Sequence, residues 1–133
     1  MSNINTVKEI YMNFGQGNVP AILEKLSENV TWDINSTVPE VPWLKPRRGR
    51  DEVIGFFESL ITFNFTKFNP HTFFENGNKV LALIDLEGIF PNNEKTYVLN
   101  NEGHLWTFDD SGRVLDYAHI CDTHTHLLAH QGK

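Results

Sequence analysis

The fold is decided by the C-terminal half of the chain, which reads FNFTKFNPHTFFENGNKVLALIDLEGIFPNNEKTYVLNNEGHLWTFDDSGRVLDYAHICD from residue 63 to residue 122. Apolar and polar residues alternate along this stretch, as they do in β-strands that bury one face. Groups of turn-forming residues interrupt the alternation at 75–78, 91–93 and 109–112. The stretch therefore predicts about four strands joined as antiparallel hairpins.

Three helices are predicted ahead of this stretch. Apolar residues with helical spacing predict a first helix from Thr6 to Phe14, a second that begins near Pro20, and a third that opens at residues 49–52. Residues 30–34 alternate like a strand, and residues 35–50 hold three prolines without any period, which is typical of a loop that closes over a site. This order lacks strand–helix–strand alternation and indicates an α+β fold.

Composition limits the kind of protein. The 133 residues fit one compact domain, and ten Phe, three Trp and three Tyr supply rigid surfaces for a core or an apolar cavity. A net charge of −6 argues against nucleic acid as a partner. The single cysteine, Cys121, excludes an internal disulfide, and the polar N-terminus does not resemble a signal peptide. No apolar stretch is long enough to span a bilayer, so we expect one cytoplasmic domain over residues 1–133 without a membrane partner.

The order of elements resembles the nuclear transport factor 2-like superfamily and, within it, the SnoaL-like group of polyketide cyclases and ketosteroid-isomerase-related proteins. The resemblance covers nearly the whole chain and is carried by Gly17-Asn18, Val30-Thr31-Trp32, Gly49-Arg50-Asp51-Glu52-Val53, His104-Leu105-Trp106-Thr107-Phe108 and Asp122-Thr123. It implies a cone-shaped, strongly curved, mostly antiparallel sheet packed on three helices, and a homodimer through the outer sheet face. The scaffold hosts isomerases, dehydratases, cyclases and pure binding proteins, so it implies a pocket more firmly than a reaction.

One pair of residues suggests acid–base chemistry. Alternation places His104 and Trp106 on one face of strand 102–108, and groups Ile120 with Asp122 in the last strand. If both sets face the interior, an imidazole and a carboxyl group on neighbouring strands form an acid–base pair. The resemblance implies the same, because Asp122 matches the acid–base aspartate of the polyketide cyclases and His104 a pocket histidine. We therefore expect Asp122 and His104 to be catalytic.

The expected ligand is a small apolar molecule, cyclic or aromatic. We expect it to contact Tyr11, Trp32, Asn35, Trp43, Phe57, Trp106 and Ile120. The activity consistent with this site is that of a cofactor-independent isomerase, cyclase or dehydratase. A non-catalytic binding or dimerisation module with the same cavity is the alternative.

Several residues depart from relatives with known reactions. Ile10 stands where ketosteroid isomerase has its oxyanion tyrosine, Ala118 stands where many relatives have arginine, and residues 81–85 lack the Arg-x-Asp pattern of limonene-epoxide hydrolase. Asp33 follows Trp32 directly, so alternation predicts that its side chain is exposed. These departures weigh against steroid isomerisation and epoxide hydrolysis.

Histidines crowd the C-terminus and raise the possibility of a metal site. His124 and His126 are two apart on a predicted strand, where both side chains reach one ion, with His119 or Asp122 as a third ligand. The chain has neither a cysteine pair nor a His-Glu-x-x-His helix, and no glycine-rich loop precedes a helix. We therefore expect no metal and no cofactor, and we expect Cys121 to be a small buried apolar residue.

Overall fold

The computed structural model describes residues 2–90 and 94–133. Within them, a six-stranded mixed sheet packs against four α-helices, which confirms the α+β fold. The helices are α1 (Asn3–Gly15), α2 (Val19–Glu24), α3 (Gly49–Ser59) and α4 (Thr123–His130), with a short 3-10 helix, η1 (Pro42–Leu44). The strands are β1 (Leu26–Trp32), β2 (Arg47–Arg48), β3 (Asn64–Asn76), β4 (Lys79–Ile89), β5 (Thr96–Phe108) and β6 (Val114–Ile120).

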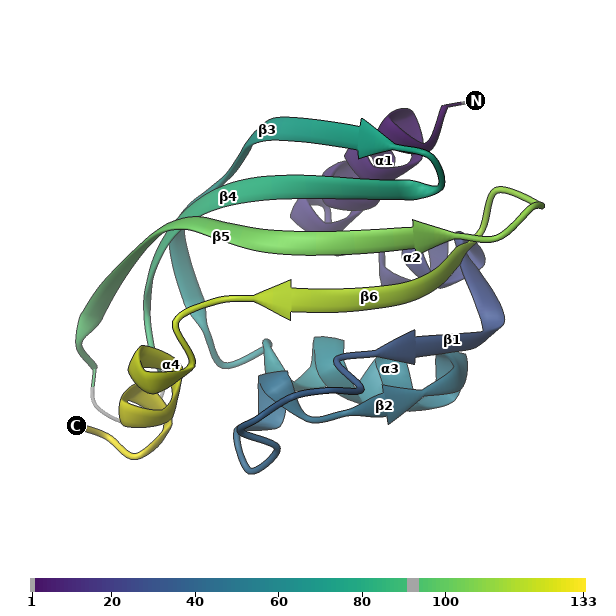
Figure 1. The fold of residues 1–133 in the computed structure, drawn as a ribbon. Coiled ribbons are helices and arrows are strands. Elements are labelled where there is room, and N and C mark those ends of the chain that lie inside the picture. Colours follow the sequence, from purple (N-terminus) through teal and green to yellow (C-terminus); the bar gives the residue numbers. More distant parts are fainter. Residues whose placement is uncertain (1, 91–93) are drawn as a thin grey trace.

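The sheet is curved, and its concave face is covered by helices. Its strand order is β2-β1-β6-β5-β4-β3, and every pair is antiparallel except β1 with β6. Figure 1 shows α1 and α2 behind the sheet, α3 beside β1 and β2, and α4 at the end where β5 bends. Among the described residues, every helix is too short or too polar to span a bilayer.

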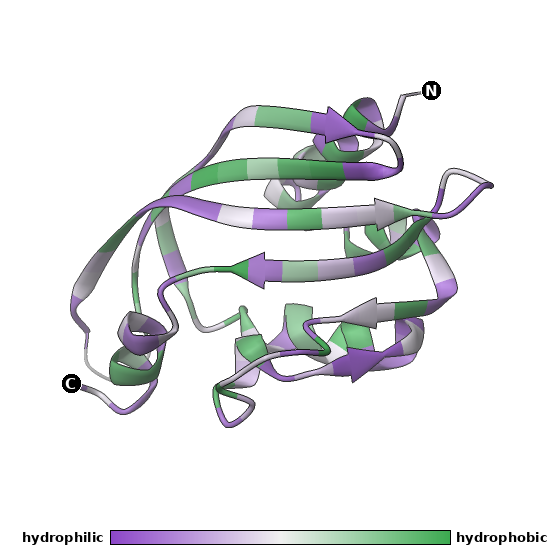
Figure 2. Cartoon of the chain, viewed as in Figure 1, coloured by the Kyte–Doolittle hydropathy of each residue, from purple (hydrophilic) through white to green (hydrophobic). Residues whose placement is uncertain are grey.

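The antiparallel meander of β3 to β6 confirms the prediction from alternation. The turns at 75–78 and 109–112 each contain a glycine with positive φ, Gly77 at 61° and Gly112 at 85°, a conformation that other residues seldom adopt. The predicted turn at 91–93 lies outside the described residues. Figure 2 shows hydrophobic residues along most of β4, a strand in which Val80, Ala82 and Ile84 are fully buried.

The C-terminal segment forms a fourth helix where a strand was expected. This corrects the predicted number of helices and the strand predicted to carry Asp122, His124 and His126. Asp122 starts α4, and its side chain accepts a hydrogen bond from the backbone N–H of Thr125 at 3.1 Å. Aspartate is a favoured residue at this capping position, and Leu127, Leu128 and Ala129 continue the helix with residues of good to high helix propensity. His124 and His126 therefore lie on a helix, two positions apart.

Asp33 also differs from the expectation of exposure, because it is buried like Trp32 before it. Its φ of 52° bends the chain at the end of β1 and ends the alternation. Its backbone N–H donates to the carbonyl of Tyr117, and its carboxylate accepts the backbone N–H of His119 at 2.7 Å. Asp33 therefore ties the end of β1 to β6 through its side chain.

Candidate functional site

A cavity of about 90 Å³ lies between the concave face of the sheet and the elements that cover it. Phenylalanine, tryptophan and aliphatic side chains from α1, α3, η1, β3 and β4 make up most of its wall. The titratable residues that border it are Tyr11, Glu102, His104, Tyr117, His119 and His126. The cavity is thus an aromatic pocket with a small polar wall.

The register of β5 against β6 decides which residues reach this cavity. His104 pairs with His119, and Trp106 pairs with Tyr117, on the concave face. Because side chains alternate between faces, Tyr117 and His119 point inward and Ile120 points to the convex face, whereas an irregularity in the pairing near Leu115 interrupts this alternation earlier in β6. This register brings three side chains from β5 and two from β6 to the same wall.

Glu102 is the centre of the polar wall. It is only 4% exposed, and its two carboxyl oxygens lie 2.9 Å from Nε2 of His119 and 2.7 Å from Nε2 of His126. Burial by itself raises the pKa of this carboxyl, but the hydrogen bonds from the two histidines outweigh it and hold the pKa below its ordinary value. Glu102 is therefore a carboxylate that accepts one N–H from each imidazole.

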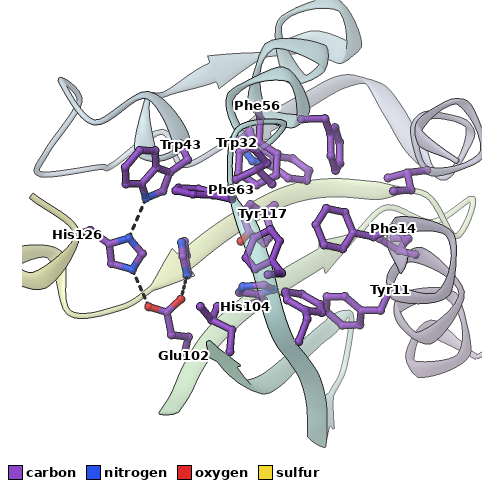
Figure 3. A pocket seen from close by; sticks show the side chains of 18 of the residues that line it. Tyr11, Phe14, Trp32, Trp43, Phe56, Phe63, Glu102, His104, Tyr117 and His126 are labelled. Atoms are coloured by element: carbon purple, nitrogen blue, oxygen red, sulfur yellow. Dashed lines mark hydrogen bonds and ion pairs between the residues drawn. The ribbon is translucent and has the colours of Figure 1, made fainter. Parts of the chain in front are cut away.

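His126 has a defined proton position. The indole Nε1 of Trp43 lies 2.8 Å from its Nδ1, and an indole N–H can only donate. Nδ1 is therefore the acceptor, and Nε2 carries the proton that is donated to Glu102. Figure 3 shows Trp43, His126 and Glu102 in this sequence at one side of the pocket, with Tyr11 and Phe14 at the opposite side.

His119 offers a different arrangement, although it also bonds Glu102. Its Nε2 donates to the carboxylate, and its Nδ1 makes no hydrogen bond within the described part of the chain. Its ring lies edge-on to the ring of His104, with the centroids 4.9 Å apart. A carboxylate that holds one imidazole N–H fixes the tautomer and leaves the other nitrogen basic.

His104 belongs to a second, neutral network. Burial, followed by the charge of His119, lowers its pKa well below the ordinary value. Its Nδ1 lies 2.8 Å from the hydroxyl of Tyr11, which accepts the indole N–H of Trp106 at 3.1 Å. Burial raises the pKa of Tyr11, so its hydroxyl keeps its proton and donates to Nδ1. His104 is therefore a neutral, firmly held group at the cavity wall.

One group of four side chains has the residue types of a metal site, but the protonation of its members does not suit metal binding. Glu102, His119, Cys121 and His126 offer ligand atoms that all lie within 4.8 Å of one another. To bind an ion through Nε2, His126 must carry its proton on Nδ1, where it would face the N–H of Trp43. Burial also raises the pKa of the Cys121 thiol to about 12. These residues therefore do not fit a metal ion in this arrangement.

Asp122 is the main correction to the expected site. It is exposed, it caps α4, and it does not border the cavity that His104 borders. Hydrogen bonds from the side chain and backbone of Thr125 lower its pKa. Alternation from Ile120 gave the wrong face, because the inward residues of β6 are Tyr117 and His119. The expected pairing of Asp122 with His104 in a common cavity is wrong.

Two of the expected ligand contacts also lie elsewhere. Ile120 is 55% exposed on the convex face, and Asn35 is exposed in the segment after β1. The other expected residues do border the cavity, namely Tyr11, Trp32, Trp43, Phe57, His104 and Trp106. Their contact with a ligand stays a prediction.

Sequence reasoning missed four polar residues of the site, namely Glu102, Tyr117, His119 and His126. Glu102 lies two positions before His104, so the same alternation already placed it on the same face. His119 and His126 were considered only as metal ligands. The register of β6 and the formation of α4, which no local pattern specified, bring both onto Glu102.

Comparison with solved structures shows the fold. A nuclear transport factor 2-like protein from Burkholderia pseudomallei K96243 superposes with a TM-score of 0.83 at 26% identity, over 96% of both chains. TerC, solved with polyporic acid, gives 0.82 at 20% identity, over 97% of this chain and 98% of that one. A proposed polyketide cyclase from Xanthomonas campestris pv. campestris gives 0.77 at 19% identity, over 96% of both chains.

Comparison of the sequence with curated proteins finds no significant match. The model of the SnoaL-like domain, in contrast, matches residues 7–117, which is most of the chain. The aromatic cavity on the concave face lies within an architecture that the solved structures share. The chain therefore belongs to the SnoaL-like domain family.

Proposed function

We propose that this protein binds a small, flat, conjugated molecule and moves a proton on it without a cofactor, with His119 as the base. The observation that carries the proposal is the buried Glu102–His119 pair, at 2.9 Å, on the wall of an aromatic cavity. The pair replaces Asp122 in the role of acid–base group, and His104 keeps a role as a neutral polar contact.

The chemistry starts with Glu102 charged and His119 neutral. Nδ1 of His119 takes a proton from an acidic C–H or O–H of the ligand, and the imidazolium that forms is stabilised by the carboxylate of Glu102. The imidazolium then gives a proton to another ligand atom, which shifts a double bond. Alternatively the deprotonated carbon attacks a carbonyl carbon of the same ligand and the proton goes to the carbonyl oxygen, which closes a ring, so the ligand gains and loses no atom. A positioned base of this kind contributes about 10²–10⁴-fold to a rate.

Negative charge that develops on a ligand oxygen during this step is stabilised by a hydrogen-bond donor. The hydroxyl of Tyr117 makes no hydrogen bond within the described residues, and burial raises its pKa well above the ordinary value. It therefore stays protonated beside the cavity and is available to donate a hydrogen bond to an oxygen. Neutral His104 is the second group on this wall that can donate, through its Nε2.

The aromatic wall supports the ligand class. Trp32 stacks on Tyr117 with the ring centroids 4.1 Å apart, and Phe56 and Trp106 lie edge-on or tilted beside them. Flat ligands pack well against such surfaces. TerC, a structural neighbour at 20% identity, was solved with polyporic acid, which supports an acidic small-molecule ligand for this chain as well.

The test is deuterium exchange into 2-cyclohexenone, a one-ring conjugated ketone with acidic C–H groups. We expect the wild-type protein to accelerate exchange in deuterated buffer, and His119→Gln and Glu102→Gln to lose most of the acceleration. Asp122→Asn is the matched control, because this exposed residue keeps its capping role as Asn. Equal exchange by wild type and His119→Gln would contradict the assignment of the base.

A non-catalytic binding protein is the second candidate. The observation that favours it is the small volume of the cavity, about 90 Å³, within a wall that is mostly aromatic. In that case 2-cyclohexenone quenches tryptophan fluorescence by binding next to Trp32 and Trp106, and exchange stays at the rate of the buffer.

We also propose that a second copy of the chain covers the convex face of the sheet. Phe74 on β3 and Ile120 on β6 are 56% and 55% exposed, and half-buried Leu81, Leu83 and Leu105 lie between them on β4 and β5. Such a patch is expected to be covered by a partner. Ile120→Asp should shift the protein to a smaller species in size-exclusion chromatography, and an unchanged elution volume would contradict this interface.

A further inference from the structure

We infer that Trp43 is a positioning residue that, together with the carboxylate of Glu102, holds the proton of His126 on Nε2 and its Nδ1 as an acceptor. With His119, these side chains form one hydrogen-bonded chain with donor–acceptor distances of 2.8, 2.7 and 2.9 Å. They come from η1, α4, β5 and β6, so four separate elements meet in it. Figure 3 shows the first three residues in line beside the cavity.

The direction of the hydrogen bonds of His126 is fixed at both of its ring nitrogens, because Trp43 can only donate and the carboxylate of Glu102 can only accept. The indole of Trp43 has one N–H and no acceptor, so Nδ1 of His126 has to accept. A neutral imidazole then carries its proton on Nε2, which points at Glu102. The other tautomer would place two N–H groups face to face at one end and two acceptors at the other.

Burial makes this direction hard to reverse. Trp43, His126 and Glu102 are all buried, so water cannot replace a lost partner. The ring of Trp43 is also held by packing, because it lies edge-on to Phe63 and Phe90, which contact each other. The fixed indole N–H of Trp43 therefore favours the tautomer of His126 that leaves Nδ1 without a proton.

The carboxylate that accepts from His126 also fixes the tautomer of His119. One oxygen of Glu102 is occupied by the N–H of His126, so the remaining oxygen is left for Nε2 of His119. In a neutral imidazole that contact holds the proton of His119 on Nε2 and leaves Nδ1 as the acceptor nitrogen. The importance of this nitrogen rests on the proposed function, whereas the proton position of His126 does not.

The chain offers a matched control for Trp43. Trp32 is also buried and also borders the cavity, but its indole N–H has no hydrogen-bond partner among residues 2–90 and 94–133. Replacing either tryptophan by phenylalanine removes an indole N–H and part of a ring. Only the replacement at Trp43 removes a donor to a histidine.

The experiment is nitrogen NMR of the histidine rings in ¹⁵N-labelled protein, at a pH well above the ordinary pKa of histidine. In the wild type we expect an unprotonated Nδ1 and a protonated Nε2 for His126, and a scalar coupling across the hydrogen bond from Nε1 of Trp43. The His126→Gln spectrum assigns the signals by their loss. Trp43→Phe should lose the coupling and shift the Nδ1 signal of His126, because this nitrogen no longer accepts a hydrogen bond, and Trp32→Phe should leave the His126 signals unchanged.

The inference is overturned by a wild-type His126 protonated on Nδ1, by Trp43→Phe signals identical to those of wild type, or by an equal change in Trp32→Phe. If Trp43→Phe does not fold, the wild-type tautomer and coupling decide alone. Exchange of 2-cyclohexenone separates the two ideas: a fixed tautomer with exchange unaffected by His119→Gln rejects only the proposed function. Exchange that depends on His119 with a mixed His126 tautomer rejects only the role of Trp43.

Discussion

Glu102 and Asp122 are two carboxylates at the same end of the sheet, and they show how surroundings decide the use of one chemical group. Both have a lowered pKa, but Glu102 is buried between two imidazoles, whereas Asp122 is exposed and bonded to Thr125. The first can hold charge next to a ligand, and the second caps a helix. Proximity in sequence to histidines therefore did not distinguish the two roles, although burial does.

The largest expected effect is the loss of Glu102. Glu102→Ala leaves the N–H groups of His119 and His126 buried without an acceptor, and we expect the free energy of unfolding to fall by about 2–4 kcal/mol. Urea denaturation of the variant and the wild type measures this difference. A loss below about 1 kcal/mol would contradict a buried and fully paired carboxylate.

Glu102→Gln sharpens the same comparison. Its amide oxygen can still accept from His126, and His119 can change tautomer to accept from the amide N–H. We therefore expect Gln to be less destabilising than Ala, with the proton of His119 moved to Nδ1. Equal destabilisation by the two substitutions would show that the imidazoles do not depend on an acceptor at this position.

The next effect is a dependence of stability on pH that originates at His104. Its folded-state pKa lies well below the ordinary value, so the unfolded chain binds the extra proton first as the pH falls. The contribution of neutral His104 to the free energy of unfolding is fully present above about pH 6.5 and is lost as the pH falls below it. We expect the urea midpoint of the wild type to fall between about pH 7.5 and pH 5, and that of His104→Asn to fall less.

Ionisation of Glu102 does not contribute to the change in urea midpoint between about pH 7.5 and pH 5. The lowered pKa of its carboxyl means that its own contribution is present above about pH 4.3 and is lost only at lower pH. Parallel midpoint curves for wild type and His104→Asn over the higher range would contradict a neutral, buried imidazole at this position.

Most of the fold could be predicted from alternation and turn residues, because the meander of β3 to β6 is built from local signals. Gly77 and Gly112 mark two of its turns, and Val80, Ala82 and Ile84 mark a buried face. The helix α4 was missed because its signal is short: one capping Asp and a few helix-forming residues follow directly on a strand. Backbone bending at Asp33 gave no local signal at all.

The site was harder to predict, because it depends on strand register. A shift of one residue in β6 exchanges Tyr117 and His119 for Ala118 and Ile120 on the concave face. Alternation supplies two such choices, and tertiary packing selects between them. His104 was placed correctly on the cavity wall, whereas Asp122 was assigned across the end of the strand, where alternation no longer applies.

A smaller effect is expected from the other carboxylate. Asp122→Ala removes the cap of α4, so we expect faster amide exchange at Thr125 and His126 and a loss of stability well below that of Glu102→Ala. Asp122→Asn should match the wild type, because Asn caps helices equally well. Slow amide exchange in the Ala variant, equal to that of the wild type, would contradict the capping role.

The smallest expected effect is on the reactivity of the Cys121 thiol, whose pKa is raised by burial and by the charges of both Glu102 and Asp122. Burial raises the pKa of Cys121 to about 12, and the charge of Glu102 raises it more than that of Asp122 does. The thiolate is the form that reacts, so iodoacetamide should modify this cysteine far more slowly than it modifies an exposed one. Glu102→Gln should speed the reaction more than Asp122→Asn, as followed by mass spectrometry. A larger acceleration from Asp122→Asn would mean that the exposed carboxylate controls this end of the sheet, which reverses the comparison drawn from burial.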